Sequence, residues 1–221
     1  MRKRQTNSKH TADRIRIDPQ RPDASGIRRA ADVIRSGGVV VFPTSGLYGL
    51  GADALNDRAV ARVFAIKRRP ADNPVLVLLP TLADMDRLVR SVPDYARPLL
   101  GLWPGGITFV FEASAHVPSA LTAGTGRIGV RLPVHPVTRA LVERVDGPVT
   151  GTSANLSGMP AAARGRDLDP TLCDAADLVL DAGDLAGGPG STIVDVSVWP
   201  IRIIREGTVR ADAIYAVLNR Q

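Results

Sequence analysis

The sequence predicts a single α/β domain built on a mixed parallel and antiparallel sheet. Its 221 residues are 44% hydrophobic and 23% charged, which is the balance of an ordinary globular chain. Short apolar runs of strand length alternate with stretches in which apolar residues recur at helical spacing. Residues 191–195 and 201–204 are neighbouring strand-like runs with no helix between them, so we expect a mixed rather than a purely parallel sheet.

The first predicted elements are a helix and a strand. Residues 23–36 have apolar side chains at helical spacing, and two glycines directly after them end the helix. The apolar run at residues 39–42 has the length and composition of a buried strand. Residues 43–51 contain three glycines and are expected to form a loop.

A second helix is predicted at residues 57–66. Val60 and Val63 recur there at helical spacing. Lys67 therefore falls at the C-terminal end of this helix. Pro70 prevents the helix from continuing much further, because proline lacks an amide donor and its ring clashes with the preceding turn.

The remaining elements follow from the same two patterns. Further helices are predicted at residues 82–90, 95–102, 136–144 and 211–218. Further strands are predicted at residues 75–79, 107–111, 127–131, 149–152, 178–181, 191–195 and 201–204. The segments rich in proline and glycine between them are too short to be interdomain linkers. The elements thus belong to one domain.

Most of the net charge lies at the N-terminus. The chain has a formal charge of +6, and residues 1–10 carry +4 of it without an acidic residue. The rest of the chain is therefore nearly neutral. We expect residues 1–22 to form a flexible basic tail and residues 23–221 to form the folded domain. Such a tail binds phosphate backbones only in a salt-sensitive, nonspecific way, and a solvated tail without a nucleic-acid partner is the simpler interpretation.

Several classes of protein are excluded by the composition. No apolar run approaches the roughly 20 residues that cross a bilayer, and no secretory signal is visible, so we expect a cytoplasmic protein. Cys173 has no second cysteine to pair with and no histidine nearby, and we interpret it as a small buried residue. His10, His116 and His135 lack the spacing of a metal site. We predict no protein-bound metal.

Lys67 is unusual because the folded domain otherwise uses arginine. The 28 basic residues include only three lysines, and the other two lie within the first ten residues. An ammonium group is a compact point charge that suits one phosphate oxygen or a crowded pocket. Lys67, Arg68 and Arg69 together could clamp a polyphosphate. The alternative is a solvated basic turn at a helix end.

Polar loops adjoin several of the predicted strands. Residues 43–51 contain two aliphatic hydroxyls, residues 151–158 contain three hydroxyls and an amide, and residues 187–192 are rich in glycine. Neither a P-loop nor a Rossmann fingerprint is present. Each loop alone could be an ordinary capped turn, but together they predict a site for a polar ligand at the strand ends.

A set of short motifs occurs in one order between residues 27 and 207. The motifs are Phe42-Pro43-Thr44, Tyr48-Gly49-Leu50-Gly51, Lys67 with Arg69-Pro70, Trp103-Pro104-Gly105 with Thr108, Val130-Arg131 with His135-Pro136, Ser153-Ala154-Asn155 with Ser157-Gly158, and Ser191-Thr192-Ile193 with Arg205 and Gly207. Through these motifs the chain resembles the YrdC-like family. Each motif is weak alone, and their joint order is what makes the resemblance specific.

The resemblance implies an enzyme. Members of the family are threonylcarbamoyl-AMP synthases, nucleotidyltransferases that make threonylcarbamoyl-AMP and pyrophosphate from L-threonine, bicarbonate and ATP. A threonylcarbamoyl transferase then uses the product to modify an adenosine of tRNA. The resemblance also implies one α/β domain with a twisted mixed sheet and flanking helices, here residues 23–221, and Mg²⁺ that arrives with ATP.

The resemblance further implies roles for individual residues. The catalytic cations that hold the triphosphate would be Lys67 and Arg69. Nucleotide would be bound by Lys67, Arg69, Ser153, Asn155 and Arg205. Threonine would be bound by Thr44, Arg131 and Ser191, with the guanidinium of Arg131 paired to the carboxylate of the amino acid.

The sequence departs from the family pattern at a few positions. Gly46 stands where a second threonine is common, and Gly106 replaces a proline. Arg127 stands where a small hydroxyl residue is common, and Leu78 or Leu79 occupies a place often held by histidine.

Two alternative functions follow from these departures and from the basic N-terminus. One is a YrdC-like protein that binds tRNA or double-stranded RNA, or associates with the ribosome, without synthase activity. The other is a related carbamoyl-adenylate reaction with a different amine or carbamoyl donor. The joint presence of Lys67, Arg69, Arg131, Ser153 and Asn155 favours the synthase.

Overall fold

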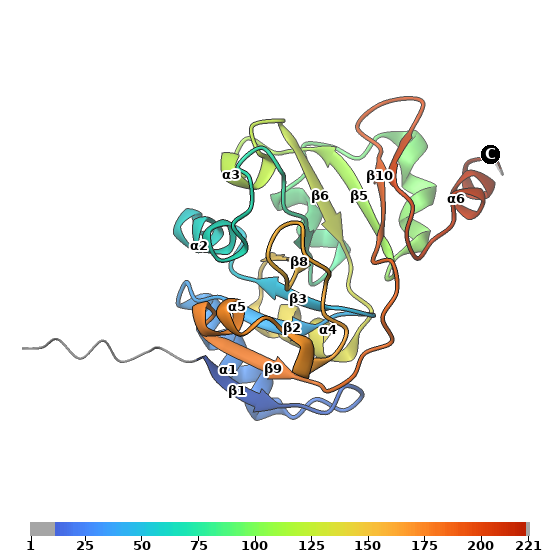
Figure 1. Ribbon diagram of the computed structural model, residues 1–221. Coiled ribbons are helices and arrows are strands. Elements are labelled where there is room, and N and C mark those ends of the chain that lie inside the picture. The colour runs from blue at the N-terminus through green and yellow to red at the C-terminus, as the bar shows by residue number, and fades with distance from the viewer. Residues whose placement is uncertain (1–11, 220–221) are drawn as a thin grey trace, which may run out of the picture.

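A computed structural model describes residues 12–219 and contains two mixed sheets flanked by helices (Figure 1). In Figure 1 a five-stranded sheet lies below a six-stranded sheet. The predicted α/β class with mixed strand directions is confirmed. The strands, however, form two hydrogen-bonded sheets rather than the single sheet expected from the sequence.

The five-stranded sheet contains the first strands of the chain. Its spatial order is β1 (Asp13–Arg16), β9 (Leu178–Asp181), β2 (Val40–Pro43), β3 (Tyr48–Gly51) and β8 (Thr152–Ser153). Strand β2 runs parallel to β9 and antiparallel to β3. Because β3 lies within residues predicted to form a loop, that part of the prediction is wrong. Glycine weakens a strand, but a side chain at Gly51 would overlap the carbonyl oxygen of Thr150.

The six-stranded sheet carries most of the remaining strands. Its spatial order is β11 (Arg202–Arg205), β10 (Thr192–Asp195), β5 (Ile107–Glu112), β6 (Arg127–Arg131), β4 (Val77–Leu78) and β7 (Val149–Thr150). Strand β5 is parallel to β10 and antiparallel to β6. These strands coincide with predicted ones to within two residues at either end.

The folded domain begins before residue 23. Strand β1 pairs with β9 in parallel, and Ile17 is buried in the core behind it. The predicted boundary between a tail at residues 1–22 and a domain at residues 23–221 is therefore too late, because apolar residues inside this basic segment find partners on a distant strand. Residues 1–11, and with them the basic cluster, lie outside the described residues.

Helices cover both faces of the five-stranded sheet. One face packs against α1 (Ala24–Arg35) and α4 (Pro136–Val145), the other against α2 (Asp57–Lys67) and α5 (Pro170–Ala175). Successive side chains of a strand point to opposite faces. Val40 and Phe42 accordingly pack with α1 and α4, whereas Val41 packs with α2. This double cover explains why β2 is apolar along its whole length.

The six-stranded sheet packs around its own core, built on Phe109 and Phe111. The surrounding helices are η1 (Leu82–Arg87), η2 (Asp94–Leu102), α3 (Ser119–Thr122) and α6 (Ala211–Leu218). A short 3₁₀ helix, η3 (Gly165–Asp167), lies between β8 and α5 along the chain. The helices predicted at residues 82–90 and 95–102 are the 3₁₀ helices η1 and η2, of which η1 is shorter than predicted. Pro98 removes a backbone donor inside η2. Among residues 12–219, no helix combines the length and apolarity that membrane spanning requires.

The two sheets meet where the chain passes directly from β7 to β8. The sequence predicts one strand at residues 149–152, but the structure divides it between the sheets at Gly151. The amide of Thr150 donates to the carbonyl of Ala52 at 2.8 Å, and the amide of Ala52 donates to the Thr150 hydroxyl at 2.9 Å. A Cβ atom at Gly151 would lie 2.7 Å from the Leu78 side chain. The close approach of the sheets therefore requires glycine here.

A buried carboxylate closes the far end of the six-stranded sheet. Asp195 accepts hydrogen bonds from Arg127 at 3.1 Å and Arg202 at 3.4 Å. Its other oxygen accepts from the amide and hydroxyl of Ser197 at 3.0 and 2.6 Å. The side chain of Asp195 is only 1% exposed, so its charge depends on these partners.

We predict that Asp195→Ala lowers the free energy of unfolding by about 3 kcal/mol, because it leaves donors without their buried acceptor. Denaturant titration measures the loss. The matched control is Asp94→Ala. Asp94 forms an ion pair of similar length with Arg97, 2.9 Å, but its side chain is 97% exposed. We expect that control to change stability by less than about 0.5 kcal/mol. Equal losses from the two variants would contradict a role for burial.

Candidate active site

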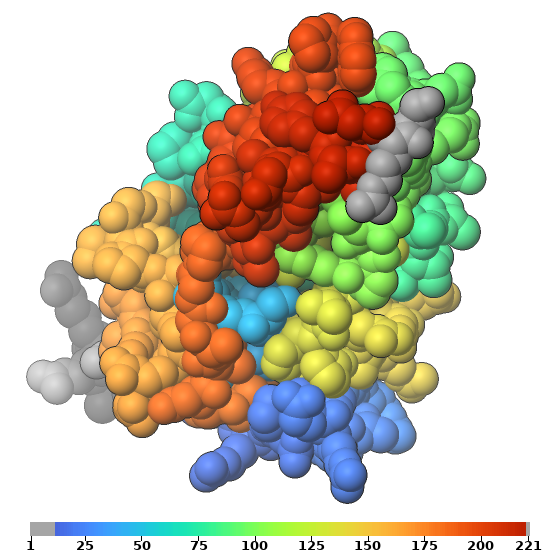
Figure 2. Space-filling model, turned by 90° about the vertical axis from the view of Figure 1, so that its right-hand side faces the viewer, coloured from blue at the N-terminus to red at the C-terminus, as the bar shows by residue number. Residues whose placement is uncertain are grey.

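The predicted site residues lie near the junction of the two sheets. Figure 2 shows the surface hollowed beside the orange segment that leads from β9 to β10. The light-blue segment that includes β2 and β3 lies at the bottom of this hollow. The residues fall into two groups, one around Lys67 and one around Arg131.

The Lys67 group ties helix α2 to the loop after β8. The ammonium group donates hydrogen bonds to the carbonyl oxygen of Ser153 and, at 2.7 Å, to that of Asn155. The amide of Ser157 donates to the carbonyl of Lys67 at 2.8 Å. The last residue of the helix is thus bonded to three positions of one loop. The sequence predicted that these residues share a site, and the structure brings them together.

Burial makes Lys67 electrostatically unusual. The residue is 1% exposed, and burial, with a smaller contribution from the nearby Arg69, lowers the pKa of its ammonium to about 8. Carbonyl oxygens can solvate an ammonium group but do not neutralise it. An anionic ligand beside Lys67 would therefore be bound strongly.

Two further side chains of this group are held by nearby backbone. Arg69 donates from Nε to the carbonyl of Asn73 and from Nη2 to that of Pro74, both at 2.8 Å. Burial lowers the pKa of Arg69. The side-chain amide of Asn155 donates to the carbonyls of Leu156 and Met159 at 2.9 and 2.6 Å. The side chains of Arg69 and Asn155 are therefore fixed in place before any ligand binds.

The Arg131 group lies at the end of β6. Arg131 donates from Nε to the carbonyl of Gly105 at 2.7 Å and from Nη2 to the hydroxyl of Ser45 at 3.0 Å. These bonds use two of the five guanidinium N–H donors. Burial, followed by the nearby positive charge of Arg205, lowers the pKa of Arg131 to about 10. The group is a half-buried cation with donors to spare.

Ser191 joins this group at the start of β10. Its hydroxyl is 3.0 Å from that of Thr108, and its carbonyl accepts from Nη2 of Arg205 at 2.7 Å. Arg205, on the edge strand β11, is exposed. The structure thus places Arg131 and Ser191, which were predicted to bind L-threonine, near Arg205, which was predicted to bind nucleotide.

Thr44 occupies the turn between β2 and β3. Its hydroxyl donates to the carbonyl of Leu47 at 2.5 Å, and its amide donates to the same oxygen at 2.9 Å. The hydroxyl oxygen keeps its lone pairs for a ligand donor. Thr44 is one residue from Ser45, which contacts Arg131. The turn therefore brings Thr44 to the Arg131 group, as predicted.

Some contacts were not assigned from the sequence. Ser45 and Thr108 touch Arg131 and Ser191, and only their hydroxyls and their places in the motifs could have signalled this. Ser157 has a buried hydroxyl without a hydrogen-bond partner among residues 12–219. Tyr48 is fully buried, and its hydroxyl donates to the carbonyl of Gly183 at 2.9 Å. Ser45 and Ser157 lie in loops beside predicted residues, whereas Tyr48 and Thr108 lie in strands β3 and β5.

Two of the departures from the family pattern have structural explanations. Arg127 faces Asp195 at the opposite end of β6 from Arg131, four residues and roughly 13 Å along the strand. It therefore stabilises the fold away from the Arg131 group. A Cβ atom at Gly106 would lie 2.7 Å from Thr208.

Other residues considered in the sequence have structural roles. His135 caps α4 by accepting from the amide of Val137 at 3.3 Å, and burial lowers its pKa. Cys173 is half-buried, and burial raises the pKa of its thiol. Residues 12–219 contain no cluster of three or more histidine, cysteine or acidic side chains able to hold a metal ion.

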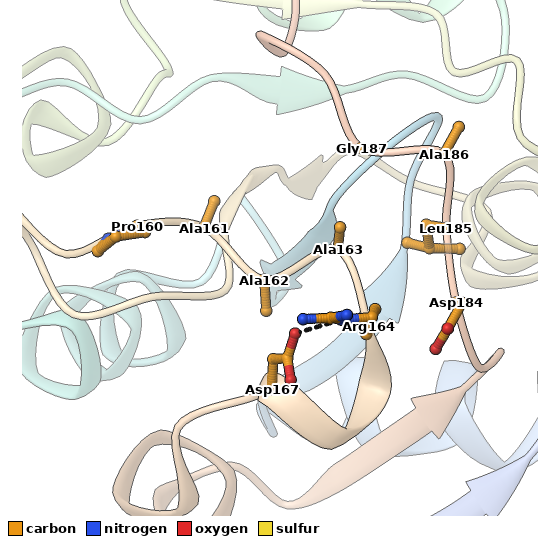
Figure 3. A pocket seen from close by; sticks show the side chains of 10 residues that line it. All are labelled: Pro160, Ala161, Ala162, Ala163, Arg164, Asp167, Asp184, Leu185, Ala186 and Gly187. Carbon is orange, nitrogen blue, oxygen red and sulfur yellow. Dashed lines mark hydrogen bonds and ion pairs between the residues drawn. The ribbon is translucent and has the colours of Figure 1, made fainter.

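A separate groove lies beside the candidate site. Figure 3 shows it between residues 160–164 and 184–187, with a volume of about 490 Å³. Its walls are mainly proline, alanine and leucine, and Arg164 pairs with Asp167 across one end at 2.6 Å. None of the predicted site residues lines it.

Comparison with known proteins agrees with this geometry. A family model named for Sua5, YciO and YrdC and described as telomere recombination matches residues 32–207. A threonylcarbamoyl-AMP synthase of Xanthomonas campestris is 34% identical over 197 residues, covering 88% of this chain and all of the relative. One of Pyrococcus abyssi is 35% identical over 194 residues, but this chain spans only 57% of its length.

Solved structures extend the match to three dimensions. The crystal structure of Pyrococcus abyssi Sua5 complexed with L-threonine has a TM-score of 0.88 and 34% identity, covering 92% of this chain and 60% of that one. Escherichia coli YciO has a TM-score of 0.84 and 25% identity, covering 92% and 99%. The resemblance inferred from the motifs is therefore confirmed, and this chain belongs to the Sua5/YciO/YrdC family.

Proposed function

We propose that this protein is a threonylcarbamoyl-AMP synthase that uses L-threonine, bicarbonate and ATP. The observation that carries the proposal is a pair of cations, the buried Lys67 and the half-buried Arg131, each hydrogen-bonded to a segment that carries hydroxyl side chains near the junction of the sheets. One cation suits a phosphate and the other a carboxylate. Relatives that bear the synthase name support this assignment.

The proposed reaction needs charge stabilisation rather than a protein nucleophile. The amine of threonine takes up the carbon of bicarbonate, with loss of water, to form a carbamate. A carbamate oxygen then attacks the α-phosphorus of ATP, and pyrophosphate leaves. Negative charge gathers on the phosphoryl oxygens and the leaving group, where Lys67, Arg69 and Arg205 supply fixed positive charge. Mg²⁺ enters with ATP as part of the substrate.

The Arg131 group suits the amino acid. A guanidinium can bind a planar carboxylate through two parallel hydrogen bonds. The hydroxyls of Thr44 and Ser191 can accept from the amine or donate to the carboxylate. Because Arg131 is already held by Gly105 and Ser45, little side-chain entropy is lost when threonine binds.

The loop after β8 suits the nucleotide. Ser153 and Asn155 are held by Lys67 through their carbonyl oxygens. A triphosphate that binds Lys67 would therefore also be close to this loop. The product would pass to a threonylcarbamoyl transferase that acts on tRNA, which fits a cytoplasmic protein. The RNA-binding alternative rests on the departures at Gly46 and Arg127 and on the basic cluster at residues 1–10, which lies outside the described residues.

The function is tested by the substrate dependence of pyrophosphate release. We expect the purified protein to convert ATP to pyrophosphate only when L-threonine and bicarbonate are both present, because the carbamate is the nucleophile. Threonylcarbamoyl-AMP is identified by mass spectrometry. Release that persists without threonine, or no release with all three substrates, would reject the proposal.

The lowered pKa of Lys67 predicts a pH limit. The ammonium form binds ATP, so kcat/KM for ATP should fall as the pH rises through about 8. Lys67→Arg keeps its charge at high pH. In this variant the fall in kcat/KM for ATP should shift to above about pH 9, whatever the loss in the maximal rate. Lys67→Ala should lower turnover by roughly two orders of magnitude. A fall at unchanged pH in Lys67→Arg would remove Lys67 from the ATP site.

The carboxylate contact predicts a selective loss of affinity. Arg131→Lys should lower the affinity for L-threonine by about tenfold or more and the affinity for ATP by much less, because an ammonium cannot form the paired hydrogen bonds of a guanidinium. Separate calorimetric titrations with each ligand measure the two affinities. Equal losses for both ligands would show that Arg131 does not recognise the amino acid.

A further inference from the structure

A glycine-rich segment runs beside the surface hollow of Figure 2 and contacts the turn that carries Thr44 and Ser45. Residues 186–190, which we call the strap, lead from β9 in one sheet toward β10 in the other (Figure 1). Figure 2 shows this orange segment passing along the edge of the hollow, next to the light-blue atoms at its bottom. The strap leads directly into Ser191, one of the residues proposed to bind threonine. Its position therefore bears on access to the amino acid.

The strap is attached at three points. Near its first end, the amide of Leu185 donates to the carbonyl of Ala163 at 2.8 Å. At its other end, the carbonyl of Gly190 accepts from the amide of Thr208 at 2.9 Å. In the middle, the amide of Gly187 donates to the carbonyl of Gly46 at 2.9 Å. The middle contact is the one that touches the turn between β2 and β3.

This middle contact requires glycine at position 46. A Cβ atom there would overlap the carbonyl oxygen of Gly187 and lie 2.9 Å from its carbonyl carbon. The φ angle of Gly46 is outside the left-handed region, so the backbone itself would accept another residue. Only the strap excludes a side chain. The resemblance leads one to expect threonine at this position, and the strap leaves no room for its side chain.

The strap can move away from the turn without breaking an element. Gly187 and Gly188 have φ angles of +75° and +110°, conformations that glycine adopts without strain and other residues avoid. Gly187 makes the contact with Gly46, and Gly188 follows it directly. Gly190, with φ +79°, lies on the other side of Pro189. Glycines in this conformation therefore lie on either side of Pro189, and the contact with Gly46 joins the strap to the turn.

The same contact bears on the substrate residues. Gly46 lies between Ser45, whose hydroxyl accepts from Arg131, and Leu47, whose carbonyl accepts from Thr44. A strap bonded to Gly46 therefore fixes the turn that presents both side chains. It also joins that turn to Ser191 on the other sheet.

We propose that Gly46 and Gly187 form a latch that holds the strap as one wall of the threonine site, which makes Gly46 a positioning residue. The inference rests on the proposed function, because it assigns the amino acid to the Arg131 group. Closing the latch orders Thr44, Ser45 and Ser191 around one ligand. Opening it separates the turn from the strap.

The test compares Gly46→Ala with Gly101→Ala. Gly101 is exposed, has ordinary φ, and a Cβ atom there would meet no heavy atom within 4 Å. We expect Gly46→Ala to lower kcat/KM for L-threonine by roughly tenfold to a hundredfold, as small misplacements in a site do. The KM for ATP should change by less than about threefold. Gly101→Ala should match the wild-type protein in both.

Hydrogen exchange separates the latch from a general loss of stability. In the wild-type protein, L-threonine should slow amide exchange in residues 186–190, and this measurement needs no variant. In Gly46→Ala the Gly187 amide should exchange faster, with no slowing by threonine. Unchanged exchange and unchanged threonine affinity in Gly46→Ala would overturn the latch. A wild-type protein that does not bind threonine in calorimetry would instead overturn the proposed function, and the inference with it.

Discussion

The close approach of two sheets at one short segment is the constraint on which the rest of the structure depends. Residues 149–153 leave one sheet and enter the other within a single glycine, Gly151. Paired hydrogen bonds between Ala52 and Thr150 hold this junction, and Gly51 lets the backbones meet. The loop that Lys67 contacts begins directly after the junction, and β6, which ends at Arg131, is joined to it through β4. Moving the junction would move both groups of the site.

The junction also explains how a chain with a nearly neutral body maintains a cationic site. Lys67 and Arg131 are withdrawn from water, which lowers the pKa of each. Their hydrogen bonds go to carbonyls and a hydroxyl rather than to carboxylates. The positive charge is thus solvated but not neutralised, and an anionic ligand would supply the neutralising negative charge. Asp195, by contrast, neutralises Arg127 at the far end of the same sheet.

The family resemblance and the geometry support different parts of the functional argument. The motifs identify which side chains belong together, and the family assignment makes the synthase the simplest function for them. The structure adds how each is held: Arg131 by Ser45 and Gly105, and Lys67 by the loop after β8. It also adds the strap, whose contact with Gly46 could not be inferred from a glycine in a turn.

The sequence by itself determined the α/β class, most strands and helices, and the residues that share a loop, because these depend on local periodicity and short motifs. Only the tertiary structure decided that the strands form two sheets, that β1 and β3 exist, and that Arg127 is structural. Those features depend on partners far along the chain. Strand β3 is rich in glycine, and β1 is short and polar, so neither has a local pattern; each is stabilised by the strand beside it.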